Sequence, residues 1–175
     1  CETGDLIMCA DQDFTTAPIE AGAYFLFVDS DSPGARGDFK LALSTTPAPI
    51  PEHDTCDSAS ELIFSAQGVA TVSSSSLYAQ DDYKGLCSAA LTGGPDVIYE
   101  FTAGTGEVLA VTVQADFEPI LYVMAQGCGD AGFPLACSST GELTVPGLAG
   151  GTYWLAVDGV QAQEWGDFDL TVTLN

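Results

Sequence analysis

The sequence contains very little positive charge. Its 175 residues include three Lys or Arg and one His against 25 Asp or Glu, which gives a formal net charge of −22 at pH 7. A surface of this sign repels phosphate groups, so nucleic acid is excluded as a partner. An acidic surface attracts divalent cations, but the composition is explained equally well by a halophilic or generally acidic protein.

Long apolar runs and catalytic motifs are missing as well. No stretch approaches the roughly 20 apolar residues of a membrane-spanning helix, and no signal peptide is present, so an export signal is expected upstream or already removed. The single His53 lies beside a proline-rich segment, and no Gly-x-Ser-x-Gly motif accompanies it. We therefore expect neither membrane insertion nor an enzyme with a Ser-His-Asp triad.

A half-domain pattern occurs twice in the chain. A Cys loop, a run from Tyr to Asp and a Gly-Asp-Phe motif follow one another near both ends. The Asp of the run and the Asp of the motif are nine residues apart in each copy, as Asp29 and Asp38 and as Asp158 and Asp167. Because a repeat sets domain boundaries, we predict the C-terminal half of a preceding domain at 1–46, a Pro-rich linker at 47–53 and a complete domain at 54–175.

The prolines of the linker and the missing front half of the first copy lead to two further expectations. Alternating prolines favour extended polyproline II, so the linker is expected to be a semi-rigid spacer. Residues 1–46 supply only about half of the strands of the fold, so they are expected to pack against material outside this chain, from upstream sequence or from a neighbouring copy.

The six cysteines form an even set without a metal-binding pattern. No Cys-x-x-Cys motif is present, so disulfides are favoured over a zinc site. Their closeness in sequence predicts the pairs Cys1–Cys9, Cys56–Cys87 and Cys128–Cys137. Disulfides predict an extracellular or cell-surface location. Acylation of Cys1, as in a lipoprotein, is disfavoured because Cys9 offers it a partner.

Alternation of apolar and polar residues with a period of two dominates 54–175. It predicts strands at 97–102, 108–113, 120–124, 153–157 and 168–172, separated by clusters of Gly, Pro, Ser and Asp. No window shows a helical stripe, and the serine run at 73–76 is expected to be an exposed loop. The pattern predicts an all-β fold, an antiparallel, jelly-roll-like β-sandwich of about eight strands.

Six motifs of 54–175 occur in the order found in a known family: Asp54-Thr55-Cys56, Asp81-Asp82-Tyr83, Gly94–Thr102, Asp116–Val123, Tyr153–Asp158 and Gly166-Asp167-Phe168. The segment resembles the bacterial pre-peptidase C-terminal (PPC) domain in its Cys-containing, tandem-repeat form, and 1–46 resembles the C-terminal half of that domain. The resemblance implies a non-catalytic extracellular β-sandwich, appended to secreted peptidases or repeated in large surface proteins. Some relatives bind calcium, and others bind polysaccharide or fibrous protein.

The resemblance also implies a calcium site. In calcium-binding relatives, acidic residues before the first strand join Asp residues of a following loop, and the matching positions are Glu52, Asp54, Asp81 and Asp82, with Asp57 as a further candidate. Calcium takes six to eight oxygen ligands, for which carboxylates are suited. The alternative is a solvated acidic edge without a bound ion.

Two other acidic motifs are set aside. Asp29-x-Asp31-x-x-Gly34 opens like an EF-hand loop, but Pro33 occupies a ligand position and no Glu closes the loop, so a turn is expected. Arg36-Gly37-Asp38 spells an integrin-type tripeptide, but the repeated Gly-Asp-Phe motif already accounts for Asp38.

Exposed aromatic side chains are the candidates for ligand or subunit contacts. Trp154 alternates with inward-facing residues, so it is predicted on the outer face of its sheet, as are Phe25 and Phe27 in the first copy. An apolar outer face is more often an interface than a ligand platform. Trp165, on a loop, is the better candidate for stacking on a sugar, although a loop Trp that caps the core is the simpler interpretation.

These features predict a non-catalytic extracellular module with a structural or adhesive role, repeated in a tandem array or fibre. Its partners would be neighbouring copies of the same module. The alternative is an accessory domain that carries a secreted peptidase or hydrolase to polysaccharide or matrix protein.

Overall fold

The computed structural model describes residues 10, 12–16, 19, 22–30, 32–47, 49–83, 87, 93–125, 127–128 and 134–175. The chain divides into two units, an N-terminal unit (Cys1–Ala48) and a C-terminal unit (Pro49–Asn175). Every strand found in the described residues belongs to the C-terminal unit.

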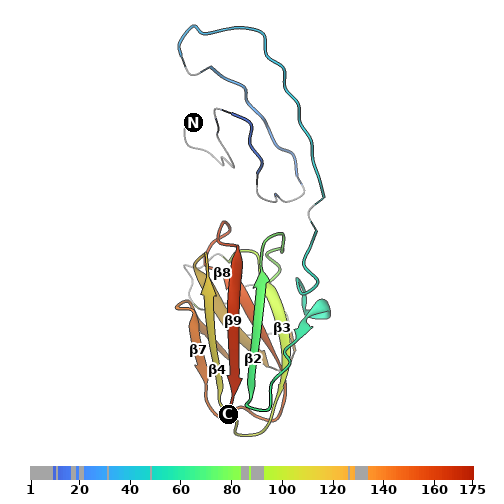
Figure 1. Ribbon diagram of the computed structural model, residues 1–175, viewed down its shortest axis with the longest axis vertical. Coiled ribbons are helices and arrows are strands. Elements are labelled where there is room, and N and C mark those ends of the chain that lie inside the picture. The colour runs from blue at the N-terminus through green and yellow to red at the C-terminus, as the bar shows by residue number, and fades with distance from the viewer. Residues whose placement is uncertain are drawn as a thin grey trace. The chain divides into compact units, whose positions relative to one another are not determined.

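The C-terminal unit is a sandwich of two sheets (Figure 1). The first sheet has the order β1 (Ser60–Glu61), β3 (Val97–Ala103), β8 (Gly151–Gly159), β5 (Pro119–Ala125) and β6 (Ala136–Ser138). The second sheet has the order β2 (Val69–Ser75), β9 (Asp167–Leu174), β4 (Leu109–Ala115) and β7 (Glu142–Val145). Among the strand pairs of the described residues, only the short β1–β3 pair is parallel, so the predicted antiparallel, all-β sandwich is confirmed.

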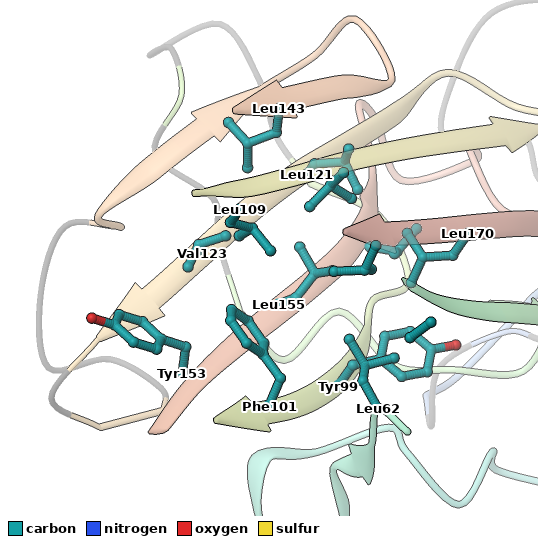
Figure 2. Close-up of a cluster of buried hydrophobic side chains, with 14 of the residues drawn as sticks. Leu62, Tyr99, Phe101, Leu109, Leu121, Val123, Leu143, Tyr153, Leu155 and Leu170 are labelled. Carbon is teal, nitrogen blue, oxygen red and sulfur yellow. The ribbon is translucent and has the colours of Figure 1, made fainter. Parts of the chain in front are cut away.

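The main core lies between the two sheets. Val97, Tyr99 and Phe101 of β3 face it, as their alternation predicts, and so do the inward residues of β8 and β9. Figure 2 shows leucines from both sheets pointing into this layer. Phe101 stacks on Tyr153, with ring centroids 5.5 Å apart. The period-two pattern therefore identifies the side chains that hold the two sheets together.

The outer face of the first sheet is also buried, in a second and smaller core. It contains Ile98, Ile120, Tyr122, Met124 and Ala156, none of them more than 7% exposed. Cysteines and aromatic residues pack against these side chains: Tyr83, Cys87, Cys128, Cys137 and Trp154. The central strands β5 and β8 are therefore covered on both faces, which explains their nearly continuous apolar sequences.

The serine run at 73–76 departs from its predicted exposed loop. Ser73, Ser74 and Ser75 continue β2 and pair with β9, and Ser76 is completely buried. Their hydroxyl groups are hydrogen-bonded: Ser73 donates to Asp169 at 2.5 Å, and Ser76 accepts from the Gly166 amide at 3.2 Å. Short polar side chains that find such partners are compatible with a strand.

Helix is nearly absent from the part of the chain that is described. It consists of one 3-10 turn, η1 (Cys56–Ser58), in which Ser58 forms a reciprocal cap with Thr55, the residue before the turn. No helix among these residues is long and apolar enough to cross a membrane.

The described part of the N-terminal unit contains no strand or helix and is exposed at every position except the half-buried Thr16. The exposed residues include large apolar side chains: Phe25 is 85% exposed and Phe27 is 88% exposed. Exposed apolar surface of this extent is typical of an interaction surface.

Candidate functional site

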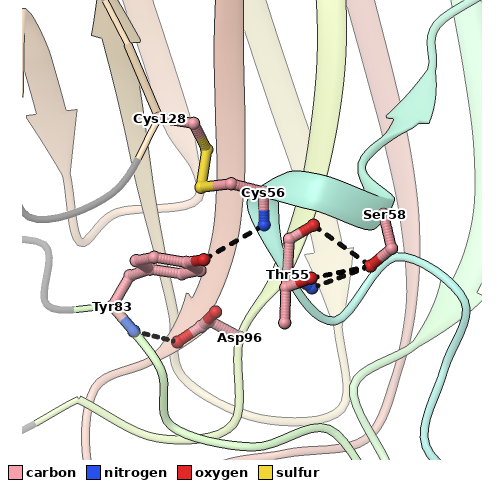
Figure 3. The surroundings of a disulfide bond; sticks show 6 residues. All are labelled: Thr55, Cys56, Ser58, Tyr83, Asp96 and Cys128. Atoms are coloured by element: carbon pink, nitrogen blue, oxygen red, sulfur yellow. Dashed lines mark hydrogen bonds between the residues drawn. A yellow bond between two sulfur atoms is a disulfide. The ribbon is translucent and has the colours of Figure 1, made fainter.

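Buried polar groups gather where the end of the linker meets the first sheet. The backbone carbonyl of His53 accepts a hydrogen bond from the Ile98 amide of β3 at 2.7 Å. The chain then turns into η1, and Figure 3 shows this turn beside Tyr83 and Asp96. This hydrogen bond holds the chain next to Asp54, one of the predicted acidic site residues, against β3.

Asp54 accepts hydrogen bonds from Gln80, the residue directly before Asp81. Its carboxylate is buried, and its Oδ1 accepts from the Gln80 backbone amide at 2.7 Å. The Gln80 side-chain amide lies 3.4 Å from Oδ2. Burial, together with the negative charge of Asp82, raises the pKa of Asp54 against the effect of these hydrogen bonds.

Asp96 lies deeper and is completely buried. Its Oδ2 accepts hydrogen bonds from the backbone amides of Asp82 at 3.1 Å and Tyr83 at 3.0 Å. Burial raises the pKa of Asp96 to about 9, and the nearby Asp158 adds to this effect. Asp96 is therefore protonated at neutral pH, which is how proteins accommodate a buried carboxyl group.

Asp158, at the end of β8, is completely buried as well and accepts a hydrogen bond from the Gly94 amide at 2.9 Å. Gly93 has a φ of +76°, and a Cβ there would lie 3.3 Å from Asp81 Oδ1 and 3.6 Å from Asp158 Oδ2. A residue without a side chain allows this close approach. Burial and the charges of Asp96 and Asp158 raise the pKa of the Tyr122 phenol.

His53 contacts a serine of β2. Its Nε2 lies 3.0 Å from Ser74 Oγ, and its ring packs on Tyr99 with centroids 5.3 Å apart. Burial lowers the pKa of His53 against the charges of Asp54 and Glu52. Both carboxylate oxygens of Asp54 face Gln80 instead of the imidazole, so Asp54 does not orient this histidine as the carboxylate of a catalytic triad does.

The predicted calcium residues are brought near one another only in part. Asp54 and Asp82 are close enough for their charges to interact, but Asp54 points inward whereas Glu52, Asp57, Asp81 and Asp82 are exposed. Within the described ranges, no group of three or more His, Cys, Asp or Glu is arranged to hold a metal ion. Calcium at Glu52, Asp54, Asp81 and Asp82 therefore stays a prediction.

The predicted disulfide pairs Cys56–Cys87 and Cys128–Cys137 are wrong. The structure pairs Cys56 with Cys128 (Figure 3) and Cys87 with Cys137, each with Cα atoms 5.6 Å apart. Cys137 lies opposite Tyr122 in the β5–β6 pair, and both side chains belong to the outer core of the first sheet. Sheet geometry thus directs Cys137 toward Cys87, which packs against the same outer core. The predicted Cys1–Cys9 pair lies outside the described residues.

The aromatic candidates separate into two groups. Trp154 packs against the outer core as a half-buried side chain, and Trp165 is half-buried on the loop before β9. Neither is a flat exposed platform. Phe25 and Phe27 of the N-terminal unit, by contrast, are almost fully exposed, which is typical of an uncovered interface.

Sequence reasoning missed Asp96, Asp158 and Tyr122 as members of a buried polar cluster. A signal was present for Asp158, because the same position in the first copy is Asp29. Asp96 directly follows Gly93-Gly94-Pro95 and precedes a buried strand. Clusters of Gly, Pro and Asp such as 93–96 predict turns, and the burial of Asp96 and Asp158 depends on packing that a local pattern does not reveal.

Comparison with known proteins reveals only a shared fold. No family model matches the sequence, and no curated protein matches it. The chain is similar to the crystal structure of Aeromonas hydrophila PliG, a periplasmic inhibitor of g-type lysozyme, with a TM-score of 0.51, 16% identity and coverage of 67% of this chain and 96% of PliG. The Salmonella Typhimurium PliG structure gives a TM-score of 0.41 at 18% identity, covering 66% of this chain and 96% of that one.

Proposed function

We propose that this chain is part of a non-catalytic, extracellular structural protein in which PPC-like sandwiches follow one another through stiff linkers. The observation that supports this most strongly is the coexistence of a complete sandwich and an exposed half-copy of the same sequence pattern. A proline-rich segment separates the two, and prolines of this spacing keep neighbouring modules apart.

The chemistry of the chain supports an extracellular or cell-envelope location. The two disulfides of the C-terminal unit form and persist in oxidising compartments. The net charge of −22 favours solubility at high local concentration, as in a surface layer of repeated modules. The similar fold of PliG belongs to an inhibitor, which supports a role in binding or assembly over one in catalysis.

The linker-side acidic residues support an additional role for calcium. An ion bound by Glu52, Asp81 and Asp82 would join the linker to the sandwich and reduce repulsion among these carboxylates. Asp54 would need to exchange its hydrogen bonds with Gln80 for the ion. Calcium would then stiffen the junction between successive modules.

The array proposal is tested on intact source cells with antibodies raised against the C-terminal unit. We expect surface labelling, and a reactive polypeptide much larger than the 18.1 kDa of this chain that limited proteolysis reduces to fragments of one-sandwich size. Labelling only after lysis, or a reactive band at 18.1 kDa alone, would contradict the proposal. A polypeptide with an attached hydrolase domain would instead support the accessory-domain alternative.

A further inference from the structure

The two copies of the repeat align over more than the motifs that reveal it. Residues 13–44 align without a gap with 142–173, each residue with the one 129 positions later. The alignment matches Phe14 with Leu143, Leu26 with Leu155 and Phe39 with Phe168. The segment 142–173 contains β7, β8 and nearly all of β9, so the N-terminal unit carries the sequence pattern of three strands of the sandwich.

The aligned residues differ sharply in burial. Leu26 is 45% exposed and Leu155 is 0% exposed, while Phe39 is 70% exposed and Phe168 is 4% exposed. The other inward positions of the repeat show the same contrast. Exposed in the first copy are Tyr24, Val28, Leu41 and Leu43, and buried at the aligned positions are Tyr153, Val157, Leu170 and Val172. The N-terminal unit therefore has the side chains of a sandwich core without the strands that cover them.

The C-terminal unit shows which strands those are. β8 lies between β3 and β5, and β9 lies between β2 and β4. β7 also pairs with β4. All four covering strands come from 69–125, so the front half of the domain supplies every neighbour of the two central strands β8 and β9.

We propose that residues 13–44 are the back half of an incomplete sandwich and bind one specific partner, a four-stranded front half of the type formed by residues 54–125. Residues 23–30 would lie between the β3-like and β5-like strands of that partner, and residues 38–44 between its β2-like and β4-like strands. This inference rests on the proposed tandem function, and it specifies how one module of the array is completed.

The disulfides extend the proposal to the cysteines. Both bonds of the C-terminal unit join the front half to the back half, Cys56 to Cys128 and Cys87 to Cys137. Cys1 and Cys9 lie outside the described residues, but their order in the repeat matches Cys128 and Cys137. Each would bond to one cysteine of the supplied front half. Two thiols are oxidised to each disulfide while one molecule of a small disulfide, such as oxidised glutathione, is reduced to two thiols.

A second copy of this chain is a less suitable source of the front half. The front half of each copy already holds its own β8 and β9 with complete pairing. Insertion of residues 13–44 into a second copy would displace residues 128–175 of that copy. The core side chains of the displaced segment would then be exposed instead. A front half that directly precedes Cys1 makes a short connection instead, as consecutive elements of a domain usually do.

The test compares the 175-residue chain with an extended chain in which a second copy of residues 54–127 is joined before Cys1, both refolded with oxidised and reduced glutathione. Amide hydrogen exchange is measured for 24–29 and 38–43. In the extended chain we expect exchange at least about 100-fold slower than in the 175-residue chain. Peptide mapping should find Cys1 and Cys9 each linked to a front-half cysteine.

Matched variants of the extended chain separate completion from general compaction. Phe39→Asp places a charge at the inward position equivalent to Phe168 and should abolish the protection, whereas Lys40→Glu, at the position of the exposed Asp169, should preserve it.

Unchanged exchange in the extended chain, or equal behaviour of the two variants, would overturn the proposal. So would concentration-dependent dimerisation of the 175-residue chain with protection of 24–29, which would make a second copy the partner. Failure of the surface-array experiment on cells would leave these results unaffected.

Discussion

The backbone amide of Tyr83 donates a hydrogen bond of 3.0 Å to the carboxyl group of Asp96, which is completely buried at the start of β3. The hydroxyl group of the same tyrosine accepts a hydrogen bond from the Cys56 amide at 3.1 Å. Tyr83 thus connects the interior carboxyl group to the disulfide-linked turn that covers the first sheet (Figure 3).

Replacing Asp96 by Asn should stabilise the C-terminal unit at neutral and alkaline pH. Because burial raises the pKa of Asp96 to about 9, the folded chain holds a proton there that the unfolded chain loses near pH 4. The free energy of unfolding therefore falls as pH rises from about 4 to about 9. Asn keeps an oxygen for both backbone amides and has no proton to lose.

The measurement is urea unfolding between pH 5 and pH 9. We expect Asp96→Asn to exceed the parent chain by at least about 1 kcal/mol at pH 8 and to show a weaker dependence on pH. Asp167→Asn, at an exposed position of β9, is the control and should leave the slope unchanged. Parallel pH profiles for the parent and Asp96→Asn would show that Asp96 is ionised in the folded chain.

Each disulfide should contribute strongly, because each closes a long loop. The bonded cysteines are 72 and 50 residues apart, for which loop-closure entropy predicts about 4 kcal/mol per bond. The double variants Cys56→Ser with Cys128→Ser, and Cys87→Ser with Cys137→Ser, should each lower the unfolding free energy by an amount of this order.

Cross-pair variants test the connectivity. Cys56→Ser with Cys87→Ser removes one cysteine from each bond, so it should abolish both bonds and destabilise more than either matched pair. Non-reducing peptide mapping that recovers Cys56 linked to Cys87 would contradict the observed pairing.

The sandwich could be predicted from the sequence because the period of two is a local signal. Val97, Tyr99 and Phe101 alternate with residues that face outward, and this alternation assigns them to the main core without knowledge of their partners. The disulfide pairs and the burial of Asp96 could not be predicted this way. Both depend on which loops cover the outer face of the first sheet, and strand periodicity does not report that arrangement.

Calcium should raise the melting temperature of the chain if Glu52, Asp54, Asp81 and Asp82 bind it. A ligand that binds only the folded state stabilises by mass action, by about 2.7 kcal/mol at a concentration 100 times its Kd. Thermal melting is compared in calcium, in magnesium and in chelator. The double variant Asp81→Asn with Asp82→Asn should remove the calcium effect, and an equal shift in magnesium would indicate general screening instead of a site.

The same substitution can be made at two aligned positions of the repeat, Phe168, which is buried, and Phe39, which is exposed. Phe168 is buried and makes an edge-to-face contact with Phe117, with ring centroids 6.5 Å apart. Truncating a buried phenylalanine costs about 3–5 kcal/mol, so Phe168→Ala should destabilise the chain by that amount. Phe39 has the same place in the repeat but is exposed, so Phe39→Ala should change stability by less than about 0.5 kcal/mol. Chemical unfolding of both variants measures the difference. A large loss for Phe39→Ala in the 175-residue chain would mean that the N-terminal unit already packs its apolar face without a supplied front half.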